Sequence, residues 1–150
     1  MENNSMTVEF ESSSNNESFA RVVVSAFVAR MNPTLTEVAD IKTAVSEAVT
    51  NSIIHGYENN TGRIRIETYI VEDTVTIIVK DNGVGIDNIE RAMEPMYTSK
   101  PELERSGMGF AFMEAFMDEL FVESKVSEGT IVTMRKVIGK SENDWGSEID

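Results

Sequence analysis

The middle of the chain carries two runs of alternating apolar residues, separated by a short acidic turn. Every second residue from Ile64 to Ile70 shares one side, and the alternation resumes from Val75 to Val79 after Glu72-Asp73. A period of two points alternate side chains to one face of a strand, so the pattern predicts a β-hairpin with one buried face. Other elements must cover that face.

The rest of the chain supplies helices for this purpose. Ser14 with Glu17, and Thr34 with Glu37, have capping-box spacing, and each pair predicts a helix start. Gly56 can end the second of these helices. Further predicted elements are a strand at 6–10, the first helix running toward residue 31, a short helix at 89–93, a helix at 110–120, and strands at 121–125 and 130–137. Strands grouped with a few helices indicate an α+β layer with helices on one sheet face.

Composition narrows the classes of function. The 150 residues contain no cysteine, which excludes disulfides and thiolate metal sites, and 41% of them are hydrophobic, enough for one core. The formal net charge of −13 disfavours direct nucleic-acid binding, and it suits either a basic protein partner or plain solubility. No apolar run approaches the roughly 20 residues that span a bilayer. We therefore expect a cytoplasmic protein without membrane contact, with one domain over residues 1–138 and a polar, disordered tail over residues 139–150.

Glu47 and Asn51 lie four residues apart on the second predicted helix and therefore project from the same face. A carboxylate can take a proton from a hydroxyl group, and an amide oxygen is a neutral ligand suited to magnesium. The pair fits Mg-ATP chemistry. Because a solvated helix face also carries Glu and Asn at this spacing, the pair gains meaning only from its context.

Two glycine motifs supply that context. Asp81-Asn82-Gly83-Val84-Gly85 follows the hairpin directly, so its glycines allow close backbone approach, and Asp81 offers an acceptor to a group such as an adenine amino group. The same letters also suit an ordinary tight turn. Gly107-Met108-Gly109 stands at the start of a predicted helix, where free amides favour a phosphate or form a plain loop-to-helix junction.

Two basic residues lie between these glycine motifs. Lys100 and Arg105 are positive charges in an acidic chain, on an irregular stretch long enough to fold over a triphosphate. They are candidate phosphate clamps.

Taken in order, Glu47-x-x-x-Asn51, Asp81-x-Gly83-x-Gly85 and Gly107-x-Gly109 resemble the N, G1 and G2 boxes of the gyrase, Hsp90, histidine-kinase and MutL superfamily of ATPases. The segments 16–21, 46–60 and 98–110 look like those of the anti-sigma F factors of spore-forming bacteria, and the similarity spans nearly all of residues 8–136. This resemblance implies a Bergerat-type ATP-binding fold, which is a two-layer α/β sandwich. Its mixed, largely antiparallel sheet is covered by helices on one face.

The resemblance also implies two cofactors, ATP and Mg²⁺, and the residues that hold them. Glu47 would be the general base that accepts the proton of a serine, Asn51 the magnesium ligand, and Asp81 the adenine anchor. The other implied nucleotide contacts are Gly83 and Gly85 at the floor of the base pocket, Lys100 and Arg105 in a mobile lid, Gly107 and Gly109 at the phosphates, and Thr130 at the adenine end.

The activity that the resemblance implies is that of a homodimeric protein serine kinase. Such a kinase holds sigma factor F inactive and phosphorylates an anti-anti-sigma protein on a serine. Arg21 resembles a family residue on the partner-binding face, although an exposed helix arginine needs no such role. Three alternatives remain open: a binding module that sequesters sigma without transferring phosphate, a kinase of a stress pathway with other partners, and a free-standing ATPase.

Overall fold

The structure, a computed structural model, describes residues 3–94 and 109–139. Its strands are β1 (Asn4–Glu11), β2 (Arg63–Val71), β3 (Thr74–Asp81), β4 (Glu119–Lys125) and β5 (Gly129–Val137). Its helices are α1 (Asn15–Val28), α2 (Leu35–Asn51), α3 (Ile89–Ala92) and α4 (Gly109–Phe116), with a 3₁₀ turn at Ala29–Met31 and a π-helical turn at Ser52–Gly56. The described strands form one sheet in the order β1-β2-β3-β5-β4.

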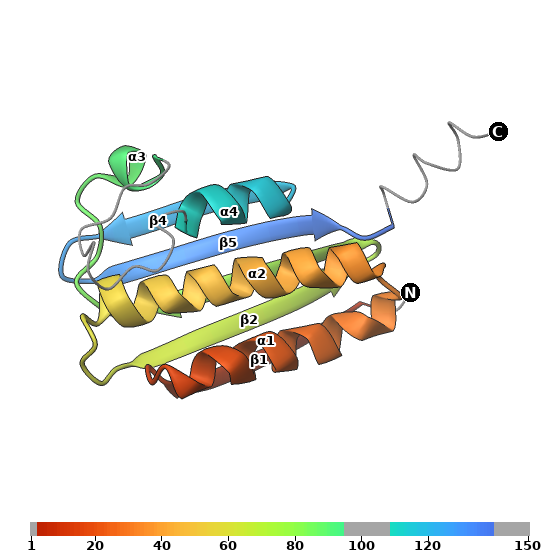
Figure 1. Cartoon of the computed structure of the whole chain (residues 1–150), viewed down its shortest axis with the longest axis horizontal. Coiled ribbons are helices and arrows are strands. Elements are labelled where there is room, and N and C mark those ends of the chain that lie inside the picture. The colour runs from red at the N-terminus through yellow and green to blue at the C-terminus, as the bar shows by residue number, and fades with distance from the viewer. Residues whose placement is uncertain (1–2, 95–108, 140–150) are drawn as a thin grey trace.

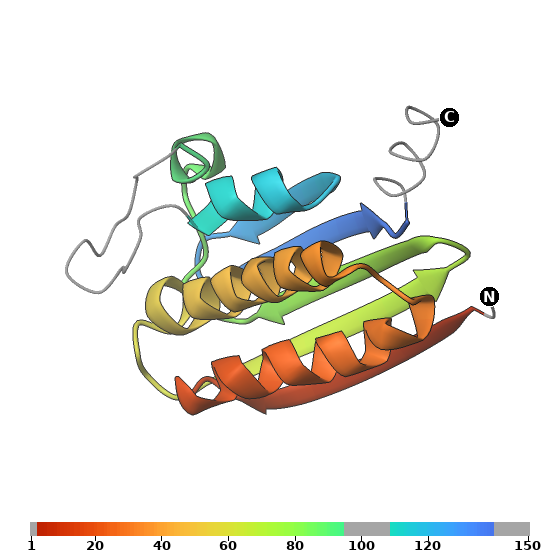
Figure 2. The ribbon, with the colours of Figure 1, turned by 45° about the vertical axis from the view of Figure 1, so that its right-hand side comes forward.

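The molecule has two layers, and the helices α1, α2 and α4 lie over one face of the sheet (Figures 1 and 2). Each pair of neighbouring strands is antiparallel, so the largely antiparallel sheet that we predicted has no parallel pair among the described strands. Helix α2 and helix α4 run in opposite directions across the sheet (Figure 1). The predicted α+β class with helices on one face is therefore confirmed.

The hairpin β2–β3 forms as its alternation predicts. Its inward-facing residues, among them Ile64, Ile66, Ile70, Val75 and Ile77, are each 0% exposed. Their neighbours point to the other face of the sheet, which the described helices leave open (Figure 2). The two faces of the hairpin therefore have different environments, one apolar and one polar.

Helix α2 begins at the capping box that the sequence predicts. The hydroxyl group of Thr34 accepts a hydrogen bond from the amide of Glu37 at 3.1 Å, and the Glu37 carboxylate accepts one from the amide of Thr34 at 2.9 Å. The apolar stripe of α2 is buried against the sheet, with Ile41, Val45 and Val49 at most 1% exposed. This capping box fixes the residue at which α2 begins. It therefore also fixes which residues lie at the other end of the helix.

The capping box predicted at Ser14 and Glu17 is wrong. Helix α1 begins at Asn15, but the side chain of Ser14 makes no capping hydrogen bond. The carboxylate of Glu17 instead accepts a hydrogen bond from the hydroxyl group of Ser46 on α2 and pairs with Arg21 at 3.3 Å. Glu17 therefore joins two helices, a tertiary contact that local spacing does not reveal.

The predicted helix at 110–120 ends too late. Helix α4 stops at Phe116, and β4 already begins at Glu119. The amide of Asp118 donates to the carbonyl group of Arg135 at 2.8 Å, so the chain joins the sheet before the helix can continue. Within the described residues, no helix is long and apolar enough to cross a membrane. Of the predicted tail at 139–150, Gly139 is described and its amide donates to the Glu37 carboxylate at 2.8 Å, whereas 140–150 lie outside the described residues.

Candidate functional site

A pocket of about 390 Å³ lies at the end of the sheet where α2 finishes, beside α3 and the start of α4. This volume is in the range of pockets that hold small ligands, roughly 300–1,000 Å³. The pocket brings together five residues that the sequence analysis singled out from separate motifs. They are Asn51, Asp81, Gly85, Gly109 and Thr130.

Asp81 is the last residue of β3, and its side chain is only 6% exposed. One carboxylate oxygen accepts a hydrogen bond from the hydroxyl group of Ser52 at 2.7 Å, and the other accepts one from the amide of Gly83 at 3.0 Å. Burial raises the pKa of Asp81, while the hydrogen bonds from Ser52, Gly83 and the Thr130 backbone act in the opposite direction. The pocket therefore contains a buried acceptor whose donors are neutral groups.

The loop after β3 packs its backbone directly against neighbouring backbone. A Cβ atom at Gly83 would lie 2.1 Å from the carbonyl oxygen of Gly56, and the amide of Val84 donates to that oxygen at 2.8 Å. Gly85 has a φ of +79°, and a Cβ atom there would lie 2.1 Å from the carbonyl oxygen of Lys125. Only glycine fits both positions, and of the two Gly85 lines the pocket whereas Gly83 does not.

Sequence reasoning missed Ser52, the main side-chain donor to Asp81. Ser52 opens the π-helical turn that extends α2, and its side chain is 5% exposed. Turns of this kind insert an extra residue into a helix and are frequent at functional sites. Ser52 stands four residues after Ala48, on the apolar stripe of α2, and a polar residue at such a buried position was the available signal.

Asn51 is the last residue of α2 and lines the pocket. Gly109, the first residue of α4, lies against it, because a Cβ atom at Gly109 would be 3.0 Å from the side-chain nitrogen of Asn51. The α4 amino terminus therefore meets the α2 carboxyl terminus at the pocket. Glu47 lies one helical turn before Asn51 and is half-buried, but it is not among the residues that line the pocket.

Thr130 lies opposite Asp81 on the neighbouring strand β5. Its hydroxyl group is 2.7 Å from the hydroxyl group of Ser124 on β4, which also accepts a hydrogen bond from the amide of Ile86 at 2.7 Å. Ser124 thus links the loop after β3 to strands β4 and β5 through hydrogen bonds. Thr130 therefore belongs to the rigid part of the pocket.

The remaining candidates fall elsewhere. Lys100, Arg105 and Gly107 lie outside the described residues. Arg21 is on α1, paired with Glu17, and does not line the pocket.

A magnesium ion would rely on few protein atoms at this pocket. Within residues 3–94 and 109–139, no three His, Asp or Glu side chains form a group that could hold a metal ion by themselves. The amide oxygen of Asn51 fits magnesium, because this ion keeps several waters and is usually bound through one or two protein groups plus substrate phosphates. Asn51 is therefore the residue here that could hold a magnesium ion together with the phosphates of a ligand.

Comparisons with known proteins identify the family to which the chain belongs. The family described as "Histidine kinase-like ATPase domain" matches residues 10–136. The anti-sigma F factor of Clostridium kluyveri is 63% identical over 137 residues, which cover 91% of this chain and 96% of the relative. The anti-sigma F factor of Clostridium perfringens strain SM101 is 60% identical over 134 residues, which cover 89% of this chain and 96% of the relative.

Two solved structures share the fold. The RsbU and RsbW domains of a Mycobacterium tuberculosis protein give a TM-score of 0.65 at 20% identity, over 90% of this chain and 32% of that chain. The catalytic domain of the histidine kinase ThkA gives a TM-score of 0.54 at 18% identity, over 89% of this chain and 97% of that chain. With the family match over most of its length and relatives at 60–63% identity, the chain belongs to the anti-sigma F factors, within the family of histidine kinase-like ATPase domains.

Proposed function

We propose that this protein is an anti-sigma factor and a protein serine kinase that binds Mg-ATP in the pocket at the end of α2. The observation that carries the proposal is the buried carboxylate of Asp81, which has neutral donors and lies in one pocket with Asn51 and the start of α4. A nucleotide offers what this arrangement lacks, namely a donor for the carboxylate at one end and negative charge for the helix start at the other.

The adenine end of the nucleotide would lie against the strands. Asp81 accepts a hydrogen bond from the adenine amino group, and its orientation is held by Ser52 and Gly83. The backbone at Gly83 and Gly85 forms the floor beneath the base, and Thr130 closes the edge from β5. These groups are already fixed by contacts within the protein, so they bind the base with little reorganisation.

The phosphate end would lie toward α4. Gly109 presents the first turn of that helix, whose free amides and dipole favour negative charge. Asn51 would hold the magnesium ion, which supplies neutralisation of phosphate charge when bound. Lys100, Arg105 and Gly107, which the sequence places between the two glycine motifs, are proposed to complete this end.

Glu47 is the proposed general base. The serine oxygen of the protein acceptor forms a bond to the γ-phosphorus, and the bond from that phosphorus to the bridging oxygen of ADP breaks. The serine proton passes to the Glu47 carboxylate. Glu47 lies one turn from Asn51 on α2, so the base and the proposed metal ligand share one rigid element.

The proposed partners follow from the relatives that are named anti-sigma F factor. They are sigma factor F, which the protein would keep from RNA polymerase, and an anti-anti-sigma protein that receives the phosphate on a serine. Arg21 on α1 is a proposed contact for these partners, and the chain is proposed to act as a homodimer in the cytoplasm. The net charge of −13 fits protein partners better than direct contact with nucleic acid.

The test is phosphate transfer from labelled ATP to the purified anti-anti-sigma protein, with the wild type beside Glu47→Gln and Glu47→Ala. We expect both variants to lose about 10²- to 10⁴-fold in transfer rate, the contribution of a positioned general base. ATP binding, measured in the same preparations by calorimetry, should persist. Full transfer by Glu47→Ala would remove Glu47 from this role. Tight binding of ATP and sigma without any transfer by the wild type would favour a protein that acts by sequestration alone.

A further inference from the structure

Lys136 lies on β5 at a position where the alternation of the strand predicts a buried apolar residue. Val132 and Met134 point into the helix-covered face and are 4% and 0% exposed. Lys136 is the next residue on that face, and its side chain is only 12% exposed. Because a buried ammonium group is costly without partners, its contacts require an explanation.

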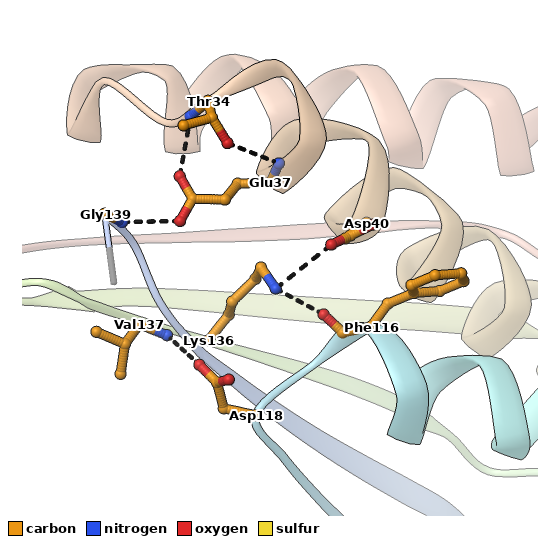
Figure 3. Close-up of polar contacts among 8 residues, drawn as sticks. All are labelled: Thr34, Glu37, Asp40, Phe116, Asp118, Lys136, Val137 and Gly139. Carbon is orange, nitrogen blue, oxygen red and sulfur yellow. Dashed lines mark hydrogen bonds and ion pairs between the residues drawn. The ribbon is translucent and has the colours of Figure 1, made fainter. Parts of the chain in front are cut away.

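The ammonium group of Lys136 joins two helices (Figure 3). It donates a hydrogen bond to the carbonyl oxygen of Phe116 at 2.7 Å, and it pairs with the carboxylate of Asp40 at 3.6 Å. Phe116 is the last residue of α4, where carbonyl groups lack a partner within the helix and where a cation is favoured by the helix dipole. Asp40 belongs to α2. Lys136 therefore links the carboxyl terminus of α4 to α2.

The same end of α4 is attached to β5 by the residue that follows the helix. The carboxylate of Asp118 accepts a hydrogen bond from the amide of Val137 at 2.7 Å, and the amide of Asp118 donates to the carbonyl group of Arg135 at 2.8 Å. These bonds flank Lys136 on both sides along the strand. The end of α4 farther from the pocket is thus held by directional contacts.

The other end of α4 lies at the pocket. The helix has eight residues, so its two ends are only roughly 12 Å apart, and a shift at Phe116 moves Gly109 almost equally. Between these ends α4 packs on α2 through apolar side chains such as Met113, which is 0% exposed. Apolar packing is non-directional, whereas hydrogen bonds have defined distances and angles. The polar contacts at Phe116 therefore add a directional constraint on where Gly109 lies beside Asn51.

We propose that Lys136 is a positioning residue for nucleotide binding, because it holds α4 at the place where its first turn meets the phosphates. This inference rests on the proposed function. Lys136 itself would not touch the nucleotide. Asp40 acts with it, since this carboxylate orients the ammonium group toward Phe116.

The test compares two ligands on the full chain. Lys136→Met keeps a long apolar side chain but removes the ammonium group. We expect its affinity for Mg-ATP to fall about tenfold, because without the ammonium group only about a tenth of the molecules would hold the first turn of α4 in the binding position. The affinity for adenosine, which has no phosphates, should change less than about twofold, since its contacts on Asp81 and Thr130 do not involve α4. Calorimetry measures both.

The matched control is Arg135→Met, which removes a cation from the adjacent residue on the open face, where it pairs with Glu119. This variant should bind both ligands as the wild type does. Lys136→Arg should restore most of the ATP affinity. Equal losses for ATP and adenosine in Lys136→Met would mean general destabilisation, and no loss for either would mean that Lys136 does not position α4. Both results overturn the inference while leaving ATP binding by the wild type intact.

A second variant keeps the test decisive if Lys136→Met does not fold. Asp40→Asn should give a smaller loss with the same preference for ATP, because it removes the charge that orients the ammonium group of Lys136. Where Lys136→Met does fold, the double variant should lose little more than Lys136→Met alone, because both changes act through one contact. An Asp40→Asn variant with unchanged ATP affinity would count against the inference. A wild type that binds neither ligand would refute the proposed function, and this inference with it.

Discussion

Two buried carboxylates on neighbouring strands have opposite electrostatic environments. Asp81 on β3 is 6% exposed and Glu67 on β2 is 7% exposed, yet the pKa of Asp81 is raised and that of Glu67 is lowered from 4.5 to about 2. Glu67 lies on the open face of the sheet, where Lys80 contacts it at 2.9 Å, Tyr69 donates at 2.8 Å and Arg65 donates at 2.9 Å. The exposed fraction of a residue therefore does not by itself decide the pKa of its carboxylate: burial is the largest cause of the raised pKa of Asp81, whereas the hydrogen bond with Lys80 is the largest cause of the lowered pKa of Glu67.

The difference lies in what surrounds each group. The charge of Glu67 is balanced by Arg65 and Lys80 of the protein itself, so this carboxylate needs no partner from a ligand. Asp81 has neutral donors and lies beside an open pocket, so it can accept a further donor from a ligand. Glu67, which is satisfied by its own chain, stabilises the fold, whereas Asp81 also borders the pocket and is the contact that we propose for a ligand.

The largest expected effect is on nucleotide affinity in Asp81→Asn. The substitution replaces one carboxylate oxygen by an amide NH2 group. This group can face Ser52 or the ligand, but it cannot accept a hydrogen bond in either place. We expect the affinity for ATP to fall about 10- to 100-fold, because a buried donor of the base loses its acceptor. Glu67→Gln is the control and should leave the affinity unchanged. Equal losses in the two variants would erase the distinction between the carboxylates.

The second prediction concerns stability and pH. Because the pKa of Glu67 is lowered in the folded state from 4.5 to about 2, its contribution to stability is complete above pH 4.5 and is lost as the pH falls toward 2. The difference in unfolding free energy between the wild type and Glu67→Gln should therefore be larger at pH 7 than at pH 3. Urea unfolding followed by circular dichroism measures it. A difference that does not vary with pH would show that the charge of Glu67 is not what matters.

Asp81→Asn should give the opposite pH dependence. A raised pKa in the folded state means that ionisation of Asp81 opposes folding, so wild-type stability from this group decreases as the pH rises above 3.8, the ordinary value for aspartate. The asparagine variant does not titrate. Its stability relative to the wild type should therefore improve with rising pH in the same urea experiments. Parallel pH profiles for the Asp81 and Glu67 variants would contradict the comparison.

A smaller effect is expected for Ser52→Ala. Its hydroxyl group donates to Asp81, and removing that donor should raise the pKa of Asp81 further. The loss of one hydrogen bond should weaken ATP binding by roughly two- to tenfold, since the carboxylate is then less well oriented. Ser52→Thr, which keeps the hydroxyl group, is the matched variant. Unchanged binding in Ser52→Ala would show that the backbone donors at Gly83 and Thr130 suffice to orient Asp81.

The smallest effect is expected for Tyr69→Phe. Tyr69 is 39% exposed, and its hydroxyl group is only one of the donors to Glu67. Its loss should raise the pKa of Glu67 while the two cations keep that pKa below 4.5. A carbon-detected NMR titration of the Glu67 carboxyl group measures the shift. A pKa that returns to its ordinary value would mean that Lys80 and Arg65 contribute little.

The sequence predicts the elements that local patterns encode. The alternation around Ile64 and Val75 predicts the hairpin, and Thr34 with Glu37 predicts the start of α2, because strand faces and capping boxes depend on residues a few positions apart. Asp81 could be singled out for a related reason, since it directly precedes glycines that the backbone requires.

Contacts between distant segments could not be predicted in this way. Glu17 pairs with Ser46 instead of capping its own helix, and Ser52, one helical turn after Ala48, donates to Asp81 on a strand 29 residues away in the sequence. Lys136 breaks the apolar alternation of β5 in the sequence. Its contacts with Phe116 and Asp40, which explain this, are seen only in the folded structure. In each case tertiary contacts override the local pattern.

The backbone floor at Gly83 and Gly85 bears on drug resistance. A Cβ atom at either position would overlap with another backbone oxygen, so point mutation cannot reshape this surface without disturbing the fold. Of these two glycines Gly85 lines the pocket, so an inhibitor that contacts Gly85 and Asp81 would leave few positions at which a mutation could weaken its binding. Resistant variants would have to arise where side chains line the pocket, at residues such as Ile86 and Val126, and a compound that avoids those two residues would retain its target for longer.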